Sequence, residues 1–330
     1  MSVRLSRRRI LQLAAGATAL PFGARSAFAL DYPQRTVRIL VGFTAGTAPD
    51  VTSRLLAAKF SDAWGFPVIV EDITGAGSNI VTDQVAKSKP DGHTLLMGGN
   101  AALVINPSLY TKLPYDPLKD FAPISQIFVA SNILVVHPDV PAKTLPELVA
   151  LARAEPGKLT YAHAGVGTSQ HLAGELFKSM AHLDIQPVAY RGTTAVTPDL
   201  LAGRVTMFFG NIVNILPLVR EGKLRAFAVT SLKRTAAAPD LPTMAEMGYP
   251  GFEAVPWFGL LAPAATDRAI IDKIYKQTMT VLAMPDVKKS FSSLAIDMIG
   301  NSPEEFAAVM KRETVQWAQV IKAAGIKIAN

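Results

Sequence analysis

Short apolar runs alternate with amphipathic segments along most of this chain. Residues 36–43 (TVRILVGF) predict a buried strand, and residues 49–64 predict the helix that follows it, with Gly65 as its stop. The same order recurs further along, with strands predicted over 67–71, 94–98, 159–162, 186–190, 205–209 and 225–230, and helices over 79–87, 144–154, 169–182, 197–202 and 215–221. Strands that alternate with helices are typical of an α/β fold.

Two further segments suggest places where the chain passes between domains. Residues 124–137 contain two β-rich stretches, and residues 251–262 (GFEAVPWFGLLA) predict a second crossing strand before two closing helices over 266–283 and 302–324. With crossings near 130 and 255, the middle of the chain is an inserted domain. The predicted division is therefore 30–130 plus 255–330 for domain 1, and 131–254 for domain 2.

The first 29 residues have the features of an export signal. SRRRIL at 6–11 fits the twin-arginine pattern, residues 10–22 are uncharged and mostly apolar, and AFA at 27–29 fits a cleavage site after Ala29. An apolar run of about 13 residues is shorter than the roughly 20 that a membrane-spanning helix needs. An arginine-rich signal for the Sec route is the alternative. Either route delivers the mature protein to the periplasm.

Removing this signal changes the charge of the protein. The chain has 33 Lys and Arg against 26 Asp and Glu, a net charge of +7, but residues 1–29 hold five arginines and no acidic residue. The mature chain keeps 28 basic against 26 acidic residues, a net charge of +2. So small a charge gives no case for nucleic-acid binding and favours anionic solutes only weakly.

Catalytic and metal-binding constellations are not evident. The chain has no cysteine, and its five histidines (93, 137, 163, 171 and 182) include no pair at the i, i+4 spacing of a helical metal site. Ser169 and His171 are close in sequence, but residues two apart on a helix face away from each other. We therefore expect no enzyme, no metal and no cofactor.

Four turns between predicted strands and helices carry small or polar residues: 43–50 (FTAGTAPD), 74–79 (TGAGSN), 164–169 (AGVGTS) and 190–195 (YRGTTA). Free amides at a helix start suit an anion, although any single glycine turn has a structural explanation. Gln170 and Ile80 stand where a dinucleotide fingerprint needs glycine, so that motif is absent. If the two domains face each other, these turns line one cleft.

At these same positions the mature chain resembles the Bug proteins, the extracytoplasmic receptors of tripartite tricarboxylate transporters. The matching motifs occur in order along nearly its whole length: YP at 32–33, VGF at 41–43, GAGSNI at 75–80, KPDGHTL at 89–95, YAHAGVGT at 161–168, HLAGE at 171–175, YRG at 190–192, DLLAG at 199–203, GKLRA at 222–226, PDLPT at 239–243 and WFGL at 257–260.

The resemblance implies a two-domain, type II periplasmic-binding-protein fold that closes over a small solute, commonly a carboxylate. Carried over by position, the ligand-binding residues are Phe43, Thr44, Ala45, Gly46, Asp50, Gly77, Ser78, Ala164, Gly165, Gly167, Thr168, His171, Gly192 and Thr193. The sequence departs from the family pattern at Thr47 and Ser78, where glycine is usual, at His163, where a small hydroxyl residue is usual, and at Thr206 and Gly210, where acids are common.

The resemblance also implies a function and its partners. A monomeric receptor captures a small organic acid by domain closure and passes it to two integral membrane permease subunits, one large and one small. A ligand-sensing subunit for a membrane sensor kinase is an alternative with the same binding chemistry, and a periplasmic enzyme on the same fold is a third. The sequence does not distinguish among dicarboxylates, citrate, aromatic acids, acidic amino acids and nicotinate-like ligands.

Overall fold

The computed structural model describes residues 31–190 and 193–326. The described residues from Pro33 onward belong to one compact unit. The predicted export signal at 1–29 lies outside the described residues. No helix of the described part is both long and apolar enough to cross a membrane.

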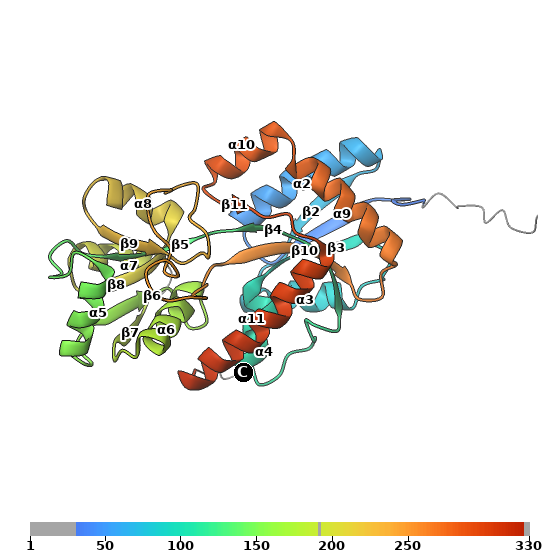
Figure 1. Cartoon of the computed structure of the whole chain (residues 1–330). Coiled ribbons are helices and arrows are strands. Elements are labelled where there is room, and N and C mark those ends of the chain that lie inside the picture. The colour runs from blue at the N-terminus through green and yellow to red at the C-terminus, as the bar shows by residue number, and fades with distance from the viewer. Residues whose placement is uncertain (1–30, 191–192, 327–330) are drawn as a thin grey trace, which may run out of the picture. The chain divides into compact units, whose positions relative to one another are not determined.

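The first of two sheets contains six strands in the order β11-β4-β10-β3-β1-β2 (Figure 1). Its strands are β1 (Val37–Val41), β2 (Val68–Asp72), β3 (Thr94–Gly99), β4 (Phe121–Val129), β10 (Trp257–Pro263) and β11 (Asp297–Met298). β1 pairs in parallel with both β2 and β3, whereas β10 lies antiparallel between β3 and β4. β1 and β3 are mostly apolar and buried, as expected for strands that helices cover on both faces, whereas β2, at the edge of the sheet, is partly exposed.

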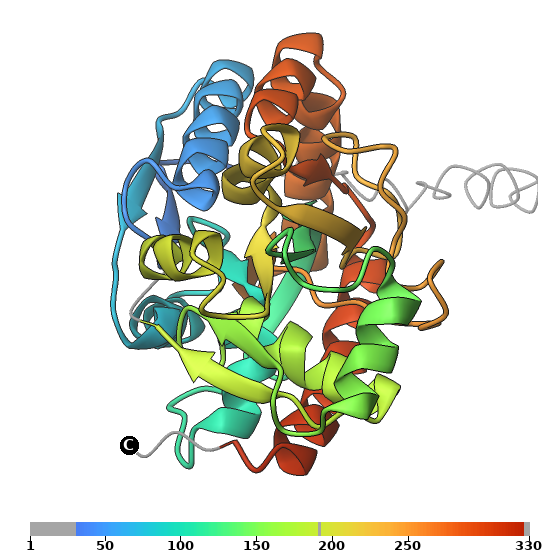
Figure 2. The same ribbon diagram turned by 90° about the vertical axis from the view of Figure 1, so that its left-hand side faces the viewer.

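The second sheet contains five strands in the order β7-β6-β8-β5-β9. Its strands are β5 (Asn132–Val136), β6 (Thr160–His163), β7 (Gln186–Ala189), β8 (Met207–Asn211) and β9 (Arg225–Val229). β6 is parallel to β7 and β8, and β5 is antiparallel to β8 and β9. Figure 2 brings this sheet and its helices, coloured green to yellow, toward the viewer.

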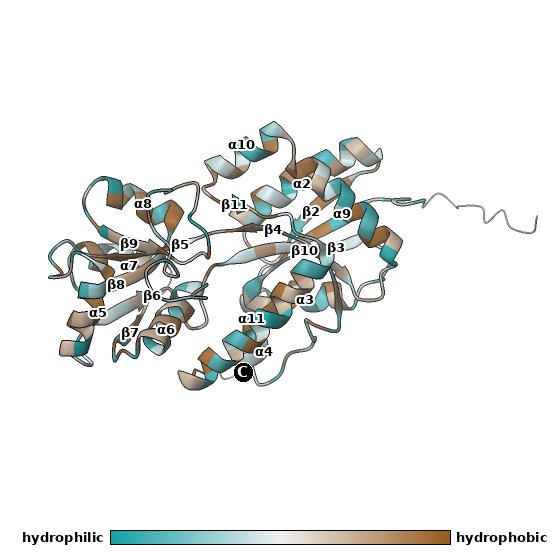
Figure 3. Ribbon diagram, viewed as in Figure 1, coloured by the Kyte–Doolittle hydropathy of each residue, from teal (hydrophilic) through white to brown (hydrophobic). Residues whose placement is uncertain are grey.

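Helices follow the strands of both sheets. Those of the first are α2 (Ala48–Trp64), η1 (Ala76–Ser78), α3 (Asn79–Ala86), η2 (Ala101–Ile105), α4 (Asn106–Leu109), α9 (Arg268–Leu282), α10 (Pro285–Ser293) and α11 (Pro303–Ala323). Those of the second are α5 (Leu145–Ala154), α6 (Ser169–Ala181), α7 (Thr193–Leu201) and α8 (Ile212–Arg220). The hydropathy colouring in Figure 3 shows mixed polar and apolar residues on these helices, as expected for helices that bury one face.

The chain passes between the sheets twice. β4 ends at Val129 and β5 begins at Asn132, while residues 254–256 lead back to β10. The amide of Ala130 donates to the carbonyl of Pro256 over 2.8 Å, so the two crossing segments are joined side by side. We propose that these crossings are the domain boundaries predicted near 130 and 255.

The structure differs from the sequence prediction in three segments. Residues 251–256 form no strand; Pro256 lacks an amide hydrogen, and β10 begins only at Trp257. A π-helix and a short α-helix, η2 and α4, follow β3 where no helix was predicted. The helix predicted over 266–283 is present as α9, but α10, with Pro285 in its first turn, and the short strand β11 follow it where no element was predicted.

Candidate functional site

The first predicted loop joins β1 to α2 and is held by its own hydrogen bonds. Asp50, which is 2 % exposed, accepts from the amide of Gly46 over 2.8 Å. Its other oxygen pairs with Arg54 Nε at 2.6 Å, and Arg54 continues to Asp72 at 2.7 Å. Asp50 therefore folds the loop rather than presenting a free carboxylate. Thr47 is the N-cap of α2 but makes no side-chain cap bond, so its side chain does not satisfy the first-turn amides of Ala48 and Asp50; Pro49, between them, has no amide hydrogen.

The second predicted turn contacts the chain just before the first loop. Ser78 Oγ donates to the carbonyl of Gly42 over 3.0 Å, and Ser78 is 7 % exposed. Gly77 and Ser78 both have left-handed backbone, with φ of 62° and 70°, so serine stands here at a position that favours glycine. The Asn106 side chain donates to the carbonyl of Gly77 over 3.3 Å. Through the bond from Ser78 to Gly42, this turn helps to hold the first loop in place.

The third predicted loop precedes α6 and is fixed by two histidines. The amide of Gly165 donates to His163 Nδ1, and the amide of Gly167 to His171 Nδ1, both over 3.2 Å. The two imidazole rings stack with centroids 4.2 Å apart. Each Nδ1 is thus an acceptor, which requires the neutral ring with its hydrogen on Nε2.

Burial explains why both rings are neutral. Burial lowers the pKa of His163 and lowers that of His171 to about 4, where the neighbouring charges of His163 and Lys178 act in the same direction. Tyr161 and Glu175 lie behind them, with the Tyr161 hydroxyl donating to Glu175 Oε1 over 2.5 Å. The loop therefore rests on a buried polar network that holds no protonated histidine at neutral pH.

Thr168 closes this loop as the N-cap of α6. Its Oγ1 accepts from the amide of His171 over 3.4 Å and donates to the carbonyl of Gly165 over 2.7 Å. The hydroxyl of Ser169 accepts from the Asn132 side chain over 3.1 Å. With Ser169 bound to Asn132 and His171 Nδ1 bound to the loop, the two side chains do not form a nucleophile–base pair.

Loops from both sheets meet at a cavity of about 320 Å³. The lining residues from the first sheet and its connections are Phe43, Ala48, Pro49, Asn100, Ala101, Ile105, Phe128, Ala130, Pro256 and Phe258, and those from the second are Gly167, Thr168, Ser169, Gln170 and Asn211. None of them carries a charge. The N-termini of α2 and α6 both open onto this cavity, so helix dipoles and first-turn amides supply its positive potential.

One wall of the cavity is aromatic. Phe258 packs edge-to-face on Phe43, with ring centroids 5.1 Å apart, and stacks on Phe128 at 4.9 Å. The adjacent Trp257 is fully buried instead, and its indole donates to Glu313 over 2.7 Å. The cavity thus combines polar helix ends with an apolar surface for the body of a ligand.

The predicted ligand residues fall into three groups. Phe43, Gly167 and Thr168 line the cavity. A second group builds or supports the lining loops without lining the cavity itself: Thr44, Ala45, Gly46, Asp50, Gly77, Ser78, Ala164, Gly165 and His171. Gly192 and the side chain of Thr193 lie outside the described residues. The assignment of all these residues to ligand binding stays a prediction.

Several lining residues were missed in the sequence, and some carried a recognisable signal. Asn100 directly follows β3 and Asn211 ends β8, so each is a polar residue at the end of an apolar strand, like those in the predicted turns. Ala130 and Pro256 had no such signal because they lie on the crossing segments. Within the described part of the chain, no group of three His, Asp or Glu residues could hold a metal ion.

A family model described as "Tripartite tricarboxylate transporter family receptor" matches residues 52–326. The chain belongs to this family. It is similar to the solved periplasmic binding protein BugD, with 35% sequence identity, a TM-score of 0.69, and coverage of 90% of this chain and 100% of that one. The predicted family, the two-domain α/β fold and the receptor function are therefore confirmed, and family members of this kind are periplasmic.

Two other solved structures carry ligands. One is an R. palustris protein with adipate, 32% identical with a TM-score of 0.73, covering 90% of this chain and 100% of that chain. The other is MatC from Rhodopseudomonas palustris with bound malate, 31% identical with a TM-score of 0.69, covering 88% and 100%. This member of the family is thus similar to BugD and to both of these proteins over most of its length.

Proposed function

We propose that this receptor binds a small dicarboxylate in the 320 Å³ cavity and delivers it to a membrane permease of one large and one small subunit. The observation that carries the proposal is the convergence of two helix N-termini, those of α2 and α6, on a cavity whose lining residues, among those that the structure describes, carry no charge. Amides at helix ends bind carboxylate oxygens without a formal cation.

The shape of the lining agrees with this ligand class. The helix ends and the Asn100 and Asn211 side chains supply polar contacts, while Phe43, Phe128 and Phe258 supply an apolar wall. Adipate and malate, bound by the two R. palustris proteins, are both dicarboxylates. The proposed role is binding without turnover, since the Ser169 and His171 side chains are occupied by structural hydrogen bonds.

A thermal-shift screen of residues 30–330 against organic acids tests the ligand class. A ligand that binds only the folded protein stabilises it by about 2.7 kcal/mol at a hundredfold excess over its dissociation constant. We expect the largest rise in melting temperature with dicarboxylates of four to six carbons, and little with the uncharged diamides of the same acids. A panel in which a neutral solute or a monocarboxylate gives the largest shift would contradict the proposal.

A further inference from the structure

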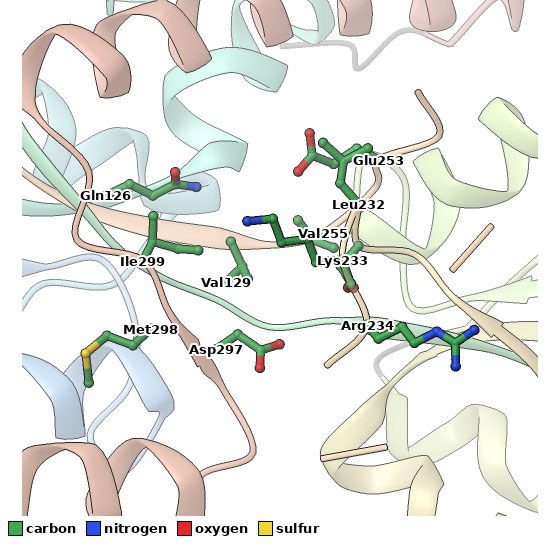
Figure 4. Close-up of a pocket in the computed structure, with 11 residues that line it drawn as sticks. Gln126, Val129, Leu232, Lys233, Arg234, Glu253, Val255, Asp297, Met298 and Ile299 are labelled. Carbon is green, nitrogen blue, oxygen red and sulfur yellow. The ribbon is translucent and has the colours of Figure 1, made fainter. Parts of the chain in front are cut away.

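A second cavity, of about 420 Å³, lies where the chain crosses between the sheets (Figure 4). We call it the hinge pocket. Its lining residues are Gln126, Val129, Ser231, Leu232, Lys233, Arg234, Glu253, Val255, Asp297, Met298 and Ile299. One wall comes from β4 and β11 of the first sheet, and the other from the segments that follow β9 of the second. Its volume is within the range of small-molecule sites.

The hinge pocket and the ligand cavity lie on opposite faces of the same two crossing segments. Val129 lines the hinge pocket, whereas its neighbour Ala130 lines the ligand cavity. Val255 and Pro256 divide in the same way. Successive side chains of extended chain point to opposite sides. A rotation about these segments that narrows one cavity therefore widens the other.

Most charged groups of the hinge pocket are already paired. Arg234 pairs with Glu246 at 3.0 Å, and Glu253 with Arg312 at 3.3 Å. Asp297 accepts from the amide of Ala236 over 3.3 Å. These contacts leave one charged group of the lining, the ammonium of Lys233, with no ion pair or hydrogen bond to any described residue.

The surroundings of Lys233 specify what it would bind. In Figure 4 its side chain extends toward Gln126 and Ile299, while the guanidinium of Arg234 points away. The backbone of Lys233 is held in place because the Ser231 hydroxyl donates to its carbonyl over 2.7 Å. Leu232 and Ile299, which face solvent at 47 % and 42 % exposure, form an apolar rim from opposite walls. A cation within an apolar rim suits an anion with a short hydrocarbon body.

We propose that the hinge pocket is a second binding site, for small amphipathic monocarboxylates, and that its occupancy favours closure of the ligand cavity. The carboxylate would pair with the ammonium of Lys233 and accept from the side-chain amide of Gln126. The hydrocarbon would lie between Leu232 and Ile299. A molecule that fills the hinge pocket keeps that pocket from narrowing. Because the two cavities lie on opposite faces of the crossing segments, the hinge pocket must narrow when the ligand cavity opens. A filled hinge pocket therefore favours the closed ligand cavity.

Hexanoate is a suitable probe, and Met298 reports on the pocket directly. In protein labelled with ¹³C at the methionine methyl groups, with the Met298 signal assigned from Met298→Leu, we expect hexanoate to shift that signal saturably. Lys233→Gln should weaken hexanoate binding about tenfold, because a hydrogen bond to a charged group is lost. The matched variant Lys112→Gln, at an exposed lysine outside the pocket, should titrate like the wild type. A Met298 signal that does not move, or that moves equally in Lys233→Gln, would overturn the site.

Coupling is measured separately, by titrating a dicarboxylate into the protein with and without saturating hexanoate. We expect hexanoate to tighten dicarboxylate binding in the wild type but not in Lys233→Gln, and the dicarboxylate to tighten hexanoate binding by the same factor. Unchanged dicarboxylate affinity would overturn the coupling. Weaker binding in both proteins would show that hexanoate enters the ligand cavity instead. The Met298 titration needs no dicarboxylate, so it is independent of the proposed function.

Discussion

At the scale of single residues, some side chains face the ligand cavity and others hold the loops around it. Thr168 does both, because its hydroxyl caps α6 and the residue also lines the cavity. Thr144 caps α5 in the same way, accepting from the amide of Glu147 over 3.3 Å, but lies outside the cavity lining. The two threonines are therefore a matched pair.

We predict that Thr168→Ala and Thr144→Ala each cost about 1 kcal/mol of stability, the usual effect of losing an N-cap. Only Thr168→Ala should weaken dicarboxylate binding, by about tenfold, because Thr168 lines the cavity and its hydroxyl holds the carbonyl of Gly165 in the loop that forms the cavity wall. Urea unfolding gives the stability and calorimetry gives the affinity. Equal affinities in the two variants would remove Thr168 from the ligand contacts.

Gly167 and Gly46 offer a second comparison. Both have left-handed backbone, with φ of 77° and 82°, so alanine at either costs about 1 kcal/mol. A Cβ at Gly46 meets open space, but at Gly167 it comes within 2.5 Å of Leu109 Cδ1. We predict that Gly167→Ala loses more stability and more ligand affinity than Gly46→Ala, measured by the same two methods. If Leu109→Ala does not recover part of the loss in Gly167→Ala, steric contact is not its cause.

The two stacked histidines predict that the stability of the folded protein depends on pH. The folded-state pKa of His171, about 4, lies below its unfolded value of 6.5, so the stabilisation is present above pH 6.5 and is lost as the pH falls toward 4. The loss amounts to about 3 kcal/mol. Urea unfolding between pH 7 and pH 4 measures it, and His171→Gln should flatten this part of the curve. An unchanged slope in that variant would contradict the assignment.

At the scale of elements, α11 anchors the second crossing segment. Glu313, on α11 and 4 % exposed, accepts from the indole of Trp257 over 2.7 Å and from that of Trp317 over 3.4 Å. Burial raises the pKa of Glu313 to about 7. The carboxyl group is therefore uncharged in acid, and its ionisation above neutral pH opposes folding.

Glu313→Gln should reveal this cost. A pKa raised in the folded state means that stability is complete below pH 4.5 and is lost as the pH rises through 7. We expect the variant to be more stable than the wild type at pH 8.5, by about 3 kcal/mol, and similar to it at pH 4. Urea unfolding of both proteins at pH 8.5 and pH 4 measures this difference in stability. A variant that is less stable at pH 8.5 would show that the charge of Glu313 is itself stabilising.

Most elements followed from local pattern, and the exceptions have identifiable causes. Most strands of both sheets are apolar runs bounded by glycine or proline turns, so their pattern was enough; the two-residue strand β11 has no such pattern and was not predicted. Four of the five residues of the π-helix at 101–105 are buried, without an amphipathic pattern, and only tertiary packing specifies this helix. Residues 251–256 are mostly apolar, and part of this segment is buried where the chain crosses between the sheets. An apolar run alone does not distinguish such a crossing segment from a strand.

The site was predicted only in part, for a related reason. Turns at strand ends mark Phe43, Gly167 and Thr168, since each sits where a strand gives way to a helix. Sequence did not separate these from Asp50 and Ser78, whose polar groups face inward to hold the loops. Ala130 and Pro256 reach the cavity only because the two crossing segments pair with each other, which is a long-range contact.

At the scale of the whole molecule, two sheets joined by two crossing segments place one cavity on each face of the junction. Domain closure in such receptors is a rotation about a few connecting residues. Here those residues are shared by both cavities, so ligand capture and hinge occupancy act on the same motion. The buried Glu313 adjoins the same junction through Trp257.

Calorimetric titration of residues 30–330 with adipate and malate, each compared with its diamide, tests whether the helix ends bind carboxylates. We expect the diacids to bind saturably without turnover, and the diamides, which have the same length but no charge, to bind at least a hundredfold more weakly. Carboxylates gain from the helix ends of α2 and α6, whereas neutral amides gain far less. Diamides that bind as tightly as the diacids would contradict carboxylate binding by the helix ends.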